Sequence, residues 1–165
     1  MLRYLTIALA ALTLAACHPK PVVAADESGA AKTFLAQNAK QPGVQVLPDG
    51  LQFKIVRSGP ANGLRPHLQD EVKVNYEGKL IDGKVFDSSY ERGQPAAMPL
   101  KGLIKGWVEA LQLMRPGDEW ILYVPPELGY GAEGAGGGEI PGGAALIFRI
   151  ELIDVLPGPG SVGNG

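Results

Sequence analysis

Apolar and polar residues alternate most regularly in the second half of the chain. Val72, Val74 and Tyr76 fall on one face of a segment that begins at Glu71, with polar residues on the other face. A period of two residues is typical of a strand that buries one face. The segment 144–155 repeats the pattern, with Leu146, Phe148, Ile150 and Leu152 on its apolar face. Both segments are therefore predicted to be strands.

Shorter segments add further strands and turns. Residues 44–47 and 51–57 flank the turn sequence Pro48-Asp49-Gly50. In the second of these, Leu51, Phe53 and Ile55 share one side, which predicts a half-buried strand. The dipeptide Asp82-Gly83 indicates a hairpin turn. Residues 120–124 are apolar on both faces, which predicts a central strand.

Two helices are predicted, and only one of them has a strong apolar face. Ile104, Trp107, Val108 and Leu111 follow the i, i+3, i+4, i+7 spacing of an amphipathic helix. A weaker helix is expected from Asp26 or Ser28 to about Ala39, packed on the domain or serving as a spacer. Five or six strands with one helix in the middle predict an α+β fold, in which a curved antiparallel sheet wraps on that helix and leaves a groove.

Composition excludes several classes of function. The 165 residues are 45% apolar, and the net charge is −2, so nothing in the balance predicts binding to nucleic acid. Cys17 is the single cysteine, and His18 and His67 are the only histidines. No internal disulfide can form, and neither a metal site nor a cofactor is expected.

The N-terminus has the pattern of an export signal. A single positive charge, Arg3, precedes an apolar run of small residues, 5–16, which is too short to span a membrane. The run ends in Leu14-Ala15-Ala16-Cys17, which resembles a bacterial lipobox with Cys17 as the lipidation site. The alternative is an ordinary signal peptide with a chance cysteine.

The predicted organisation therefore has four parts. These are a lipoprotein signal peptide (1–16), a tether with a short helix (17–43), the main domain (44–156) and a disordered tail (157–165). The expected location is the bacterial cell envelope, with the protein anchored by lipid on the periplasmic side. The residue after the cysteine is His18 rather than aspartate, which favours the outer membrane.

The candidate chemistry lies in the aromatic residues. Ser88 and Ser89 have no histidine near them in sequence, and the chain has no Gly-x-Ser-x-Gly elbow, so a hydrolase is disfavoured. Aromatic residues fall in five separate elements, at Tyr76, Phe86, Trp107, Tyr130 and Phe148. Asp87 follows Phe86 in an apolar context, where a carboxylate needs a partner or water. Arg92 is available as that partner.

Several motifs resemble the FKBP-type peptidyl-prolyl isomerases, in particular the bacterial Mip/FkpA-like branch. They are Asn75-Tyr-Glu-Gly78, Gly83-Lys-Val-Phe-Asp-Ser-Ser89, Leu103-Ile-Lys-Gly-Trp107, Leu128-Gly-Tyr-Gly131 and Leu146-Ile-Phe148. The match runs in order from about Gly50 to Val155. The resemblance implies an FKBP-like fold and an enzyme that accelerates X–Pro isomerisation during the folding of exported proteins.

The resemblance also implies roles for individual residues. Phe86, Asp87 and Tyr130 would be catalytic. The residues that would bind substrate are Tyr76, Phe86, Asp87, Arg92, Met98, Leu103, Ile104, Trp107, Tyr130, Ile140 and Phe148. Among these, Trp107 would form the floor under the proline ring, the Ile104 N–H and the Tyr130 hydroxyl would each bond a carbonyl, and Arg92 would orient Asp87.

The expected partners are proline-containing polypeptides, tacrolimus-like macrolides and, through the lipid, a membrane. The chain departs from the family pattern at Ala96, Met98 and Glu139, which bears on macrolide affinity and substrate preference. The long dimerising helix of the Mip branch is absent, so a monomer is expected. The alternative function is a binding module that holds proline segments as a chaperone or scaffold, with little turnover.

Overall fold

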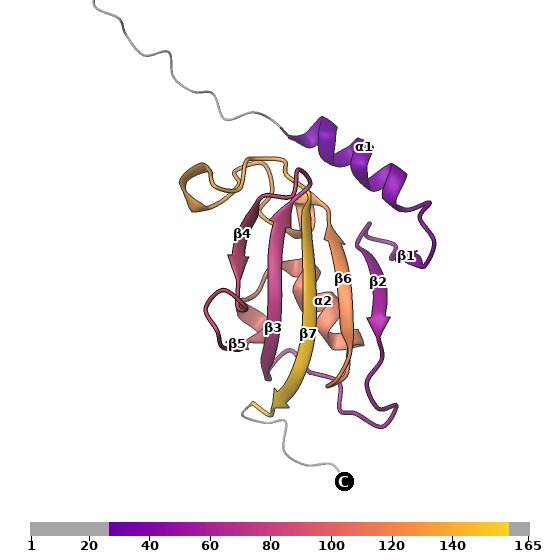
Figure 1. Cartoon of the computed structure of the whole chain (residues 1–165), viewed down its shortest axis with the longest axis vertical. Helices are drawn as coiled ribbons and strands as arrows, with labels where there is room; N and C mark the ends of the chain where they lie inside the picture. Colours follow the sequence, from indigo (N-terminus) through magenta and orange to yellow (C-terminus); the bar gives the residue numbers. More distant parts are fainter. Residues whose placement is uncertain (1–26, 159–165) are drawn as a thin grey trace, which may run out of the picture.

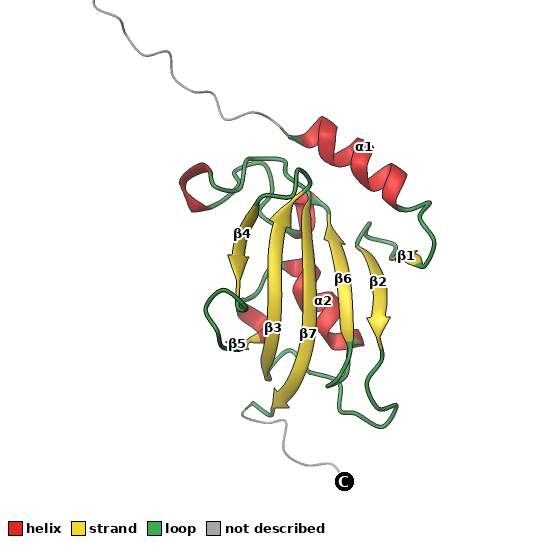
Figure 2. Cartoon of the chain, in the orientation of Figure 1, coloured by secondary structure: helices red, strands yellow, loops and turns green. Residues whose placement is uncertain are grey.

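The computed structural model describes residues 27–158, which form a single antiparallel sheet with two α-helices (Figures 1 and 2). The helices are α1 (Ser28–Asn38) and α2 (Lys105–Leu113). The strands are β1 (Val44–Val46), β2 (Gln52–Arg57), β3 (Glu71–Leu80), β4 (Val85–Ser88), β5 (Ala96–Pro99), β6 (Glu119–Val124) and β7 (Leu146–Leu156). Their order in the sheet is β1-β2-β6-β7-β3-β4, and β5 also pairs with β3.

The two longest strands, β3 and β7, form the centre of the sheet. Val72, Val74 and Tyr76 point to the core from β3, and the apolar face of β7 is buried beside them, so both predicted alternations are confirmed. The predicted strand 120–124 is confirmed as β6, next to β7 in the sheet. Alternation buries one face of each strand because successive side chains point to opposite sides.

Helix α2 lies against one face of the sheet, behind the strands in the view of Figure 1. Its apolar stripe places Trp107, Ala110 and Leu111 in the core, which confirms the predicted amphipathic helix. Gly106 allows the helix to approach β6, because a Cβ there would lie 2.9 Å from a methyl group of Val124. The helix and the sheet therefore enclose one core, as the predicted α+β architecture requires.

Helix α1 packs on the β1–β2 flank of the sheet, far along the sheet from β4. Gln52 of β2 is buried, donates to the Leu35 carbonyl over 2.9 Å and accepts from Asn38 Nδ2 over 2.8 Å. The Phe34 ring lies 6.1 Å from that of Tyr123 in β6. The helix was predicted either to pack on the domain or to act as a spacer, and these contacts show that it packs.

Two details of the sheet differ from the prediction. The described residues contain seven strands rather than five or six. The predicted burial of Ile55 is wrong, since this side chain is 41% exposed. An irregular register between Ile55 and Arg57 marks a bulge, and bulges bend a strand away from regular pairing.

Several predictions concern residues outside 27–158. The predicted signal peptide, Cys17, most of the tether before α1 and the tail beyond Gly158 lie outside the described residues. Within the described residues, neither helix is long and apolar enough to cross a membrane. The predicted domain boundaries stay predictions.

Candidate functional site

The β3–β4 hairpin brings the first site residues together. In its register, Glu77 pairs with Ser88 and Gly78 with Asp87. The Ser89 hydroxyl accepts the Tyr76 N–H over 2.9 Å, and the Ser89 N–H donates to the Tyr76 carbonyl over 2.9 Å. Because these bonds fix the end of β4 against Tyr76, the side chains of Tyr76 and Asp87 are held next to each other.

Gly78 lets two aromatic rings meet over β3. It pairs with Asp87 of β4 on one side and with Phe148 of β7 on the other. A Cβ at this position would lie 2.7 Å from Phe148 and 2.8 Å from Phe86, which is closer than atoms pack in proteins. The absence of a side chain at Gly78 is therefore a condition for the Phe86–Phe148 contact.

Four aromatic rings form the apolar interior of the site. Trp107 of α2 lies edge-on to Tyr76 and to Phe148, with centroid distances of 5.1 and 5.2 Å. Phe86 meets Phe148 edge-on at 5.6 Å. These are favourable geometries for aromatic pairs, so the rings hold one another in place. Trp107 is 4% exposed, and its Nε1 has no hydrogen-bond partner within the described chain.

Asp87 is held by two donors at the edge of this aromatic group. The Tyr76 hydroxyl donates to Asp87 Oδ2 over 2.5 Å, and the Arg92 guanidinium donates to Asp87 Oδ1. Arg92 also donates to the Tyr76 hydroxyl over 2.8 Å and lies 5.4 Å from the centre of the Tyr76 ring. The three side chains therefore form a closed polar triangle beside the aromatic interior.

The triangle keeps Asp87 ionised. Burial by itself raises the pKa of Asp87, but the hydrogen bonds from Tyr76 and Arg92 outweigh it, and the net pKa is below the ordinary value. Burial and the neighbouring carboxylate raise the pKa of Tyr76, so its hydroxyl stays protonated and continues to donate. At neutral pH the site therefore has a fixed carboxylate paired with a fixed guanidinium.

These side chains surround a cavity of about 400 Å³. It is lined by Tyr76, Phe86, Asp87, Met98, Gly102, Leu103, Ile104, Trp107, Tyr130, Ala135, Gly136, Glu139, Ile140 and Phe148. All the residues expected to bind substrate lie in this lining except Arg92, which contacts Asp87 and Tyr76 from outside it. Ala96 does not line the cavity and packs at the edge of the core.

Four lining residues were missing from the predicted binding set, namely Gly102, Ala135, Gly136 and Glu139. Gly102 ends a 3₁₀ turn, Leu100–Gly102, between β5 and α2. The other three belong to the glycine-rich loop, residues 131–143. Glycine and alanine carry no chemical signal, but the carboxylate next to Ile140 was a sign that this loop reaches the site.

Two hydrogen-bond donors at the cavity are free to meet a ligand. Within residues 27–158, the Ile104 backbone N–H and the Tyr130 hydroxyl have no hydrogen-bond partner. Burial and the charge of Asp87 both raise the pKa of Tyr130, so its hydroxyl carries a proton at neutral pH. The cavity therefore combines an apolar interior with two donors suited to carbonyl oxygens.

The arrangement does not provide a nucleophile. Ser89 is fully buried and bonded to the Tyr76 backbone, while His67 is exposed and lies 3.4 Å from Asp70. In the part of the chain that the structure describes, no group of three His, Cys, Asp or Glu side chains could hold a metal ion. The chemistry of the site is that of shape, apolar surface and oriented polar groups.

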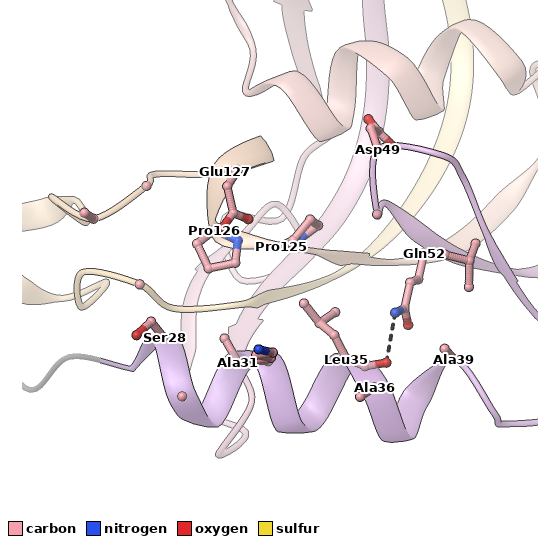
Figure 3. A pocket seen from close by; sticks show the side chains of 17 residues that line it. Ser28, Ala31, Leu35, Ala36, Ala39, Asp49, Gln52, Pro125, Pro126 and Glu127 are labelled. Atoms are coloured by element: carbon pink, nitrogen blue, oxygen red, sulfur yellow. Dashed lines mark hydrogen bonds between the residues drawn. The ribbon is translucent and has the colours of Figure 1, made fainter.

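A larger cavity, of about 870 Å³, lies between α1 and the body of the domain (Figure 3). Its lining includes Ala31, Leu35, Pro125 and Pro126, and the bond from Gln52 to the Leu35 carbonyl crosses it. Small apolar side chains and proline rings dominate this groove, and the polar triangle is not part of it. We therefore assign the candidate site to the smaller, aromatic cavity.

Comparison with known proteins shows the family of the chain. The sequence profile described as "FKBP-type peptidyl-prolyl cis-trans isomerase" matches residues 63–153, which include the whole cavity lining. The chain belongs to this family. A second profile, "Domain amino terminal to FKBP-type peptidyl-prolyl isomerase", matches residues 13–55. The FKBP resemblance noted in the motifs is thus confirmed.

Curated FKBP relatives are longer than this chain. The "Peptidyl-prolyl cis-trans isomerase Mip" of Coxiella burnetii is 56% identical over 124 residues, which are 75% of this chain and 53% of that protein. The "FKBP-type 22 kDa peptidyl-prolyl cis-trans isomerase" of Escherichia coli is 49% identical over 123 residues, covering 74% and 58% of the two chains. The chain spans about half the length of the curated relatives it matches.

Solved FKBP structures share the fold. FkpA from Escherichia coli superposes with a TM-score of 0.76 at 43% identity, over 82% of this chain and 62% of FkpA. A peptidyl-prolyl cis-trans isomerase from Pseudomonas syringae gives a TM-score of 0.72 at 41% identity, over 79% of this chain and 93% of that chain. The predicted FKBP-like α+β fold is confirmed.

Proposed function

We propose that this FKBP-family chain is a peptidyl-prolyl cis-trans isomerase that accelerates X–Pro isomerisation during the folding of exported proteins. One observation carries the proposal. An apolar cavity of about 400 Å³ has aromatic walls and an ion-paired carboxylate, Asp87, at its edge. A cavity of this volume can take a proline ring together with part of the flanking peptide.

The cavity lowers the barrier through the difference in solvation between two states of the substrate. Amide resonance makes the planar X–Pro bond charge-separated and opposes rotation by about 18–20 kcal/mol. Water stabilises the planar form more than the twisted form, because the twisted bond has less charge separation. An apolar site on Trp107, with walls from Phe86 and Phe148, removes that water and therefore favours the twisted state.

Oriented donors would hold the substrate while the bond turns. The free Ile104 N–H and the free Tyr130 hydroxyl are suited to the carbonyl oxygens on the two sides of the bond. Asp87 would face the twisting peptide with its charge fixed by Tyr76 and Arg92. No covalent bond forms or breaks in this rotation, so these residues act by binding the twisted geometry more tightly than the planar one.

The test is isomerase activity of the purified full-length chain on an Ala-Leu-Pro-Phe peptide. Asp87→Leu and Trp107→Leu are each expected to lower turnover about 10- to 100-fold, since hydrogen bonds to charged groups and a buried ring each contribute about 1.5–3 kcal/mol. Glu91→Leu is the matched control, because Glu91 is exposed, lies beside Arg92 and does not line the cavity. Circular dichroism would verify that every variant is folded.

The outcome separates the enzyme from the alternative. Full turnover in both cavity variants would refute the assignment of the site. Peptide binding without acceleration by the wild type would refute the enzyme and favour the binding module.

We further propose that tacrolimus-like macrolides occupy the same cavity. Its apolar lining and its free Ile104 N–H support this, since such ligands present a ring and carbonyl groups in place of a proline peptide. Tacrolimus is expected to inhibit turnover by competing with the peptide. Inhibition that is not relieved by excess peptide would exclude the cavity as its site.

We also propose that Cys17 is lipidated and anchors a monomer to the periplasmic face of the outer membrane. The Leu14-Ala15-Ala16-Cys17 sequence supports the lipid, and a relative 48% identical over 122 residues is named "Outer membrane protein MIP" of Legionella longbeachae. Labelled palmitate should enter the wild type but not Cys17→Ala, and light scattering should give the mass of one chain. Label retained by Cys17→Ala would rule out this site.

A further inference from the structure

The cavity lining contains two carboxylates with different surroundings. Asp87 is ion-paired with Arg92 and bonded to Tyr76. Glu139 is exposed and makes no ion pair within residues 27–158. No lysine or arginine is part of the lining, so the charge of Glu139 is not compensated at the cavity.

The loop geometry holds Glu139 at this position. Ala135 and Ile140 form a β-bridge, with N–H to carbonyl distances of 2.9 and 3.1 Å. Three of the four residues between them, Gly136–Gly138, have positive φ values of 63 to 104°, a region that glycine enters without strain. The chain therefore reverses within four residues. Ile140 is 6% exposed and packs in the core, which fixes the backbone of its neighbour Glu139.

Other charges near the mouth do not cancel that of Glu139. Lys101 and Lys105 flank the rim residues Leu103 and Ile104 in sequence, but both are exposed and neither lines the cavity. Glu133 belongs to the same loop and is also exposed outside the lining. The loop side of the cavity is therefore negative at the point where substrate residues next to the proline would pass.

We propose that Glu139 gives the site a preference for substrates with a lysine or arginine immediately next to the proline. The inference rests on the proposed isomerase function and concerns its substrate class. Glu139 would attract the cationic side chain across the mouth without touching the twisting bond. An exposed ion pair contributes about 0.2–1 kcal/mol, which corresponds to a preference of about 1.4- to 5-fold.

The experiment compares peptides with the full-length chain, using exchange NMR so that no coupling protease restricts the sequence. One series is Ala-Xaa-Pro-Phe and the other is Ala-Leu-Pro-Xaa, with Xaa as lysine, leucine or glutamate. In the wild type, lysine should exceed glutamate in kcat/KM in at least one series. Glu139→Gln should reduce that ratio about 1.4- to 5-fold, and added salt should reduce the wild-type ratio in the same direction.

Two comparisons decide the outcome. Glu133→Gln removes the same charge from the same loop outside the lining, and it should leave the ratio unchanged. A lysine-to-glutamate ratio that is the same in the wild type and in Glu139→Gln, or that shifts equally in Glu133→Gln, overturns the inference. Turnover of the leucine peptides by all three proteins shows that the isomerase proposal stands even in that case, so the two failures are distinguishable.

Discussion

The carboxyl pair formed by Asp49 and Glu109 gives the domain a specific dependence on pH. Asp49 lies in the β1–β2 turn, where it accepts the Leu51 N–H over 3.1 Å, and Glu109 lies on α2. The hydrogen bond to Asp49 and burial raise the pKa of Glu109 from 4.5 to about 7. The same hydrogen bond lowers the pKa of Asp49. The proton therefore stays on Glu109 and bridges to an ionised Asp49.

The sign of the effect follows from proton binding. Between pH 4.5 and pH 7 the folded state keeps a proton on Glu109 that the unfolded state has lost. Stability from this group is therefore fully present below about pH 4.5 and is lost as the pH rises through about 7. The full shift would correspond to about 3.4 kcal/mol at 1.36 kcal/mol per pKa unit. Asp49 is exposed, so solvent screening reduces our expectation to about 1 kcal/mol.

Glu109→Gln isolates this contribution. The amide keeps a donor for Asp49 but has no charge, so the variant should match the wild type near pH 4 and exceed it by about 1 kcal/mol near pH 8. For a domain of this size, that is a gain of about 3 °C in Tm. Urea unfolding across this pH range measures the free energy of unfolding. Asp49→Asn should reduce the pH dependence of that free energy in the same way. If the free energy of unfolding depends on pH in the same way in the wild type and in Glu109→Gln, the pair does not share a proton.

Three further substitutions test the positions of other groups. Gly78→Ala would push a methyl group into the rings of Phe86 and Phe148, so urea unfolding should show about 1–3 kcal/mol of destabilisation. In the peptide assay, the folded fraction of this variant should also turn over substrate more slowly than the wild type. Gln52→Ala removes the two hydrogen bonds that join α1 to β2, so hydrogen exchange in α1 should accelerate about 10-fold while turnover persists. Tyr76→Phe removes a donor from Asp87, so the Asp87 pKa should rise in carbon-detected NMR titrations; an unchanged pKa would contradict the hydrogen bond.

Sequence pattern was sufficient where one rule decided the structure. The alternation at Val72, Val74 and Tyr76 predicted β3 because its buried face is continuous. The same rule gave the wrong result at Ile55, which is exposed and lies next to the irregular register between β2 and β6. Gln52 alternated as though it faced water, but it is buried against α1. Tertiary pairing that local sequence does not encode decides both cases.

The site was predictable to a similar extent. The aromatic residues and Asp87 were expected together because a carboxylate beside Phe86 required a partner, and the structure contains the ion pair with Arg92. The bond from Arg92 to the Tyr76 hydroxyl was not foreseen, since it joins residues 16 positions apart across a hairpin. The lining by Ala135 and Gly136 was missed because residues with little or no side chain contribute only through backbone position.

If the lipid proposed at Cys17 holds the N-terminus, the packing of α1 has a mechanical consequence. The Glu27 N–H donates to the Gly142 carbonyl over 3.1 Å, at the end of the loop that carries Glu139. The far end of α1 is bonded to Gln52 of β2. Force applied at the N-terminus would act first on the Glu27–Gly142 hydrogen bond and would then separate α1 from the sheet. The force would therefore reach the glycine-rich loop that carries Glu139 before it reaches the central strands β3 and β7.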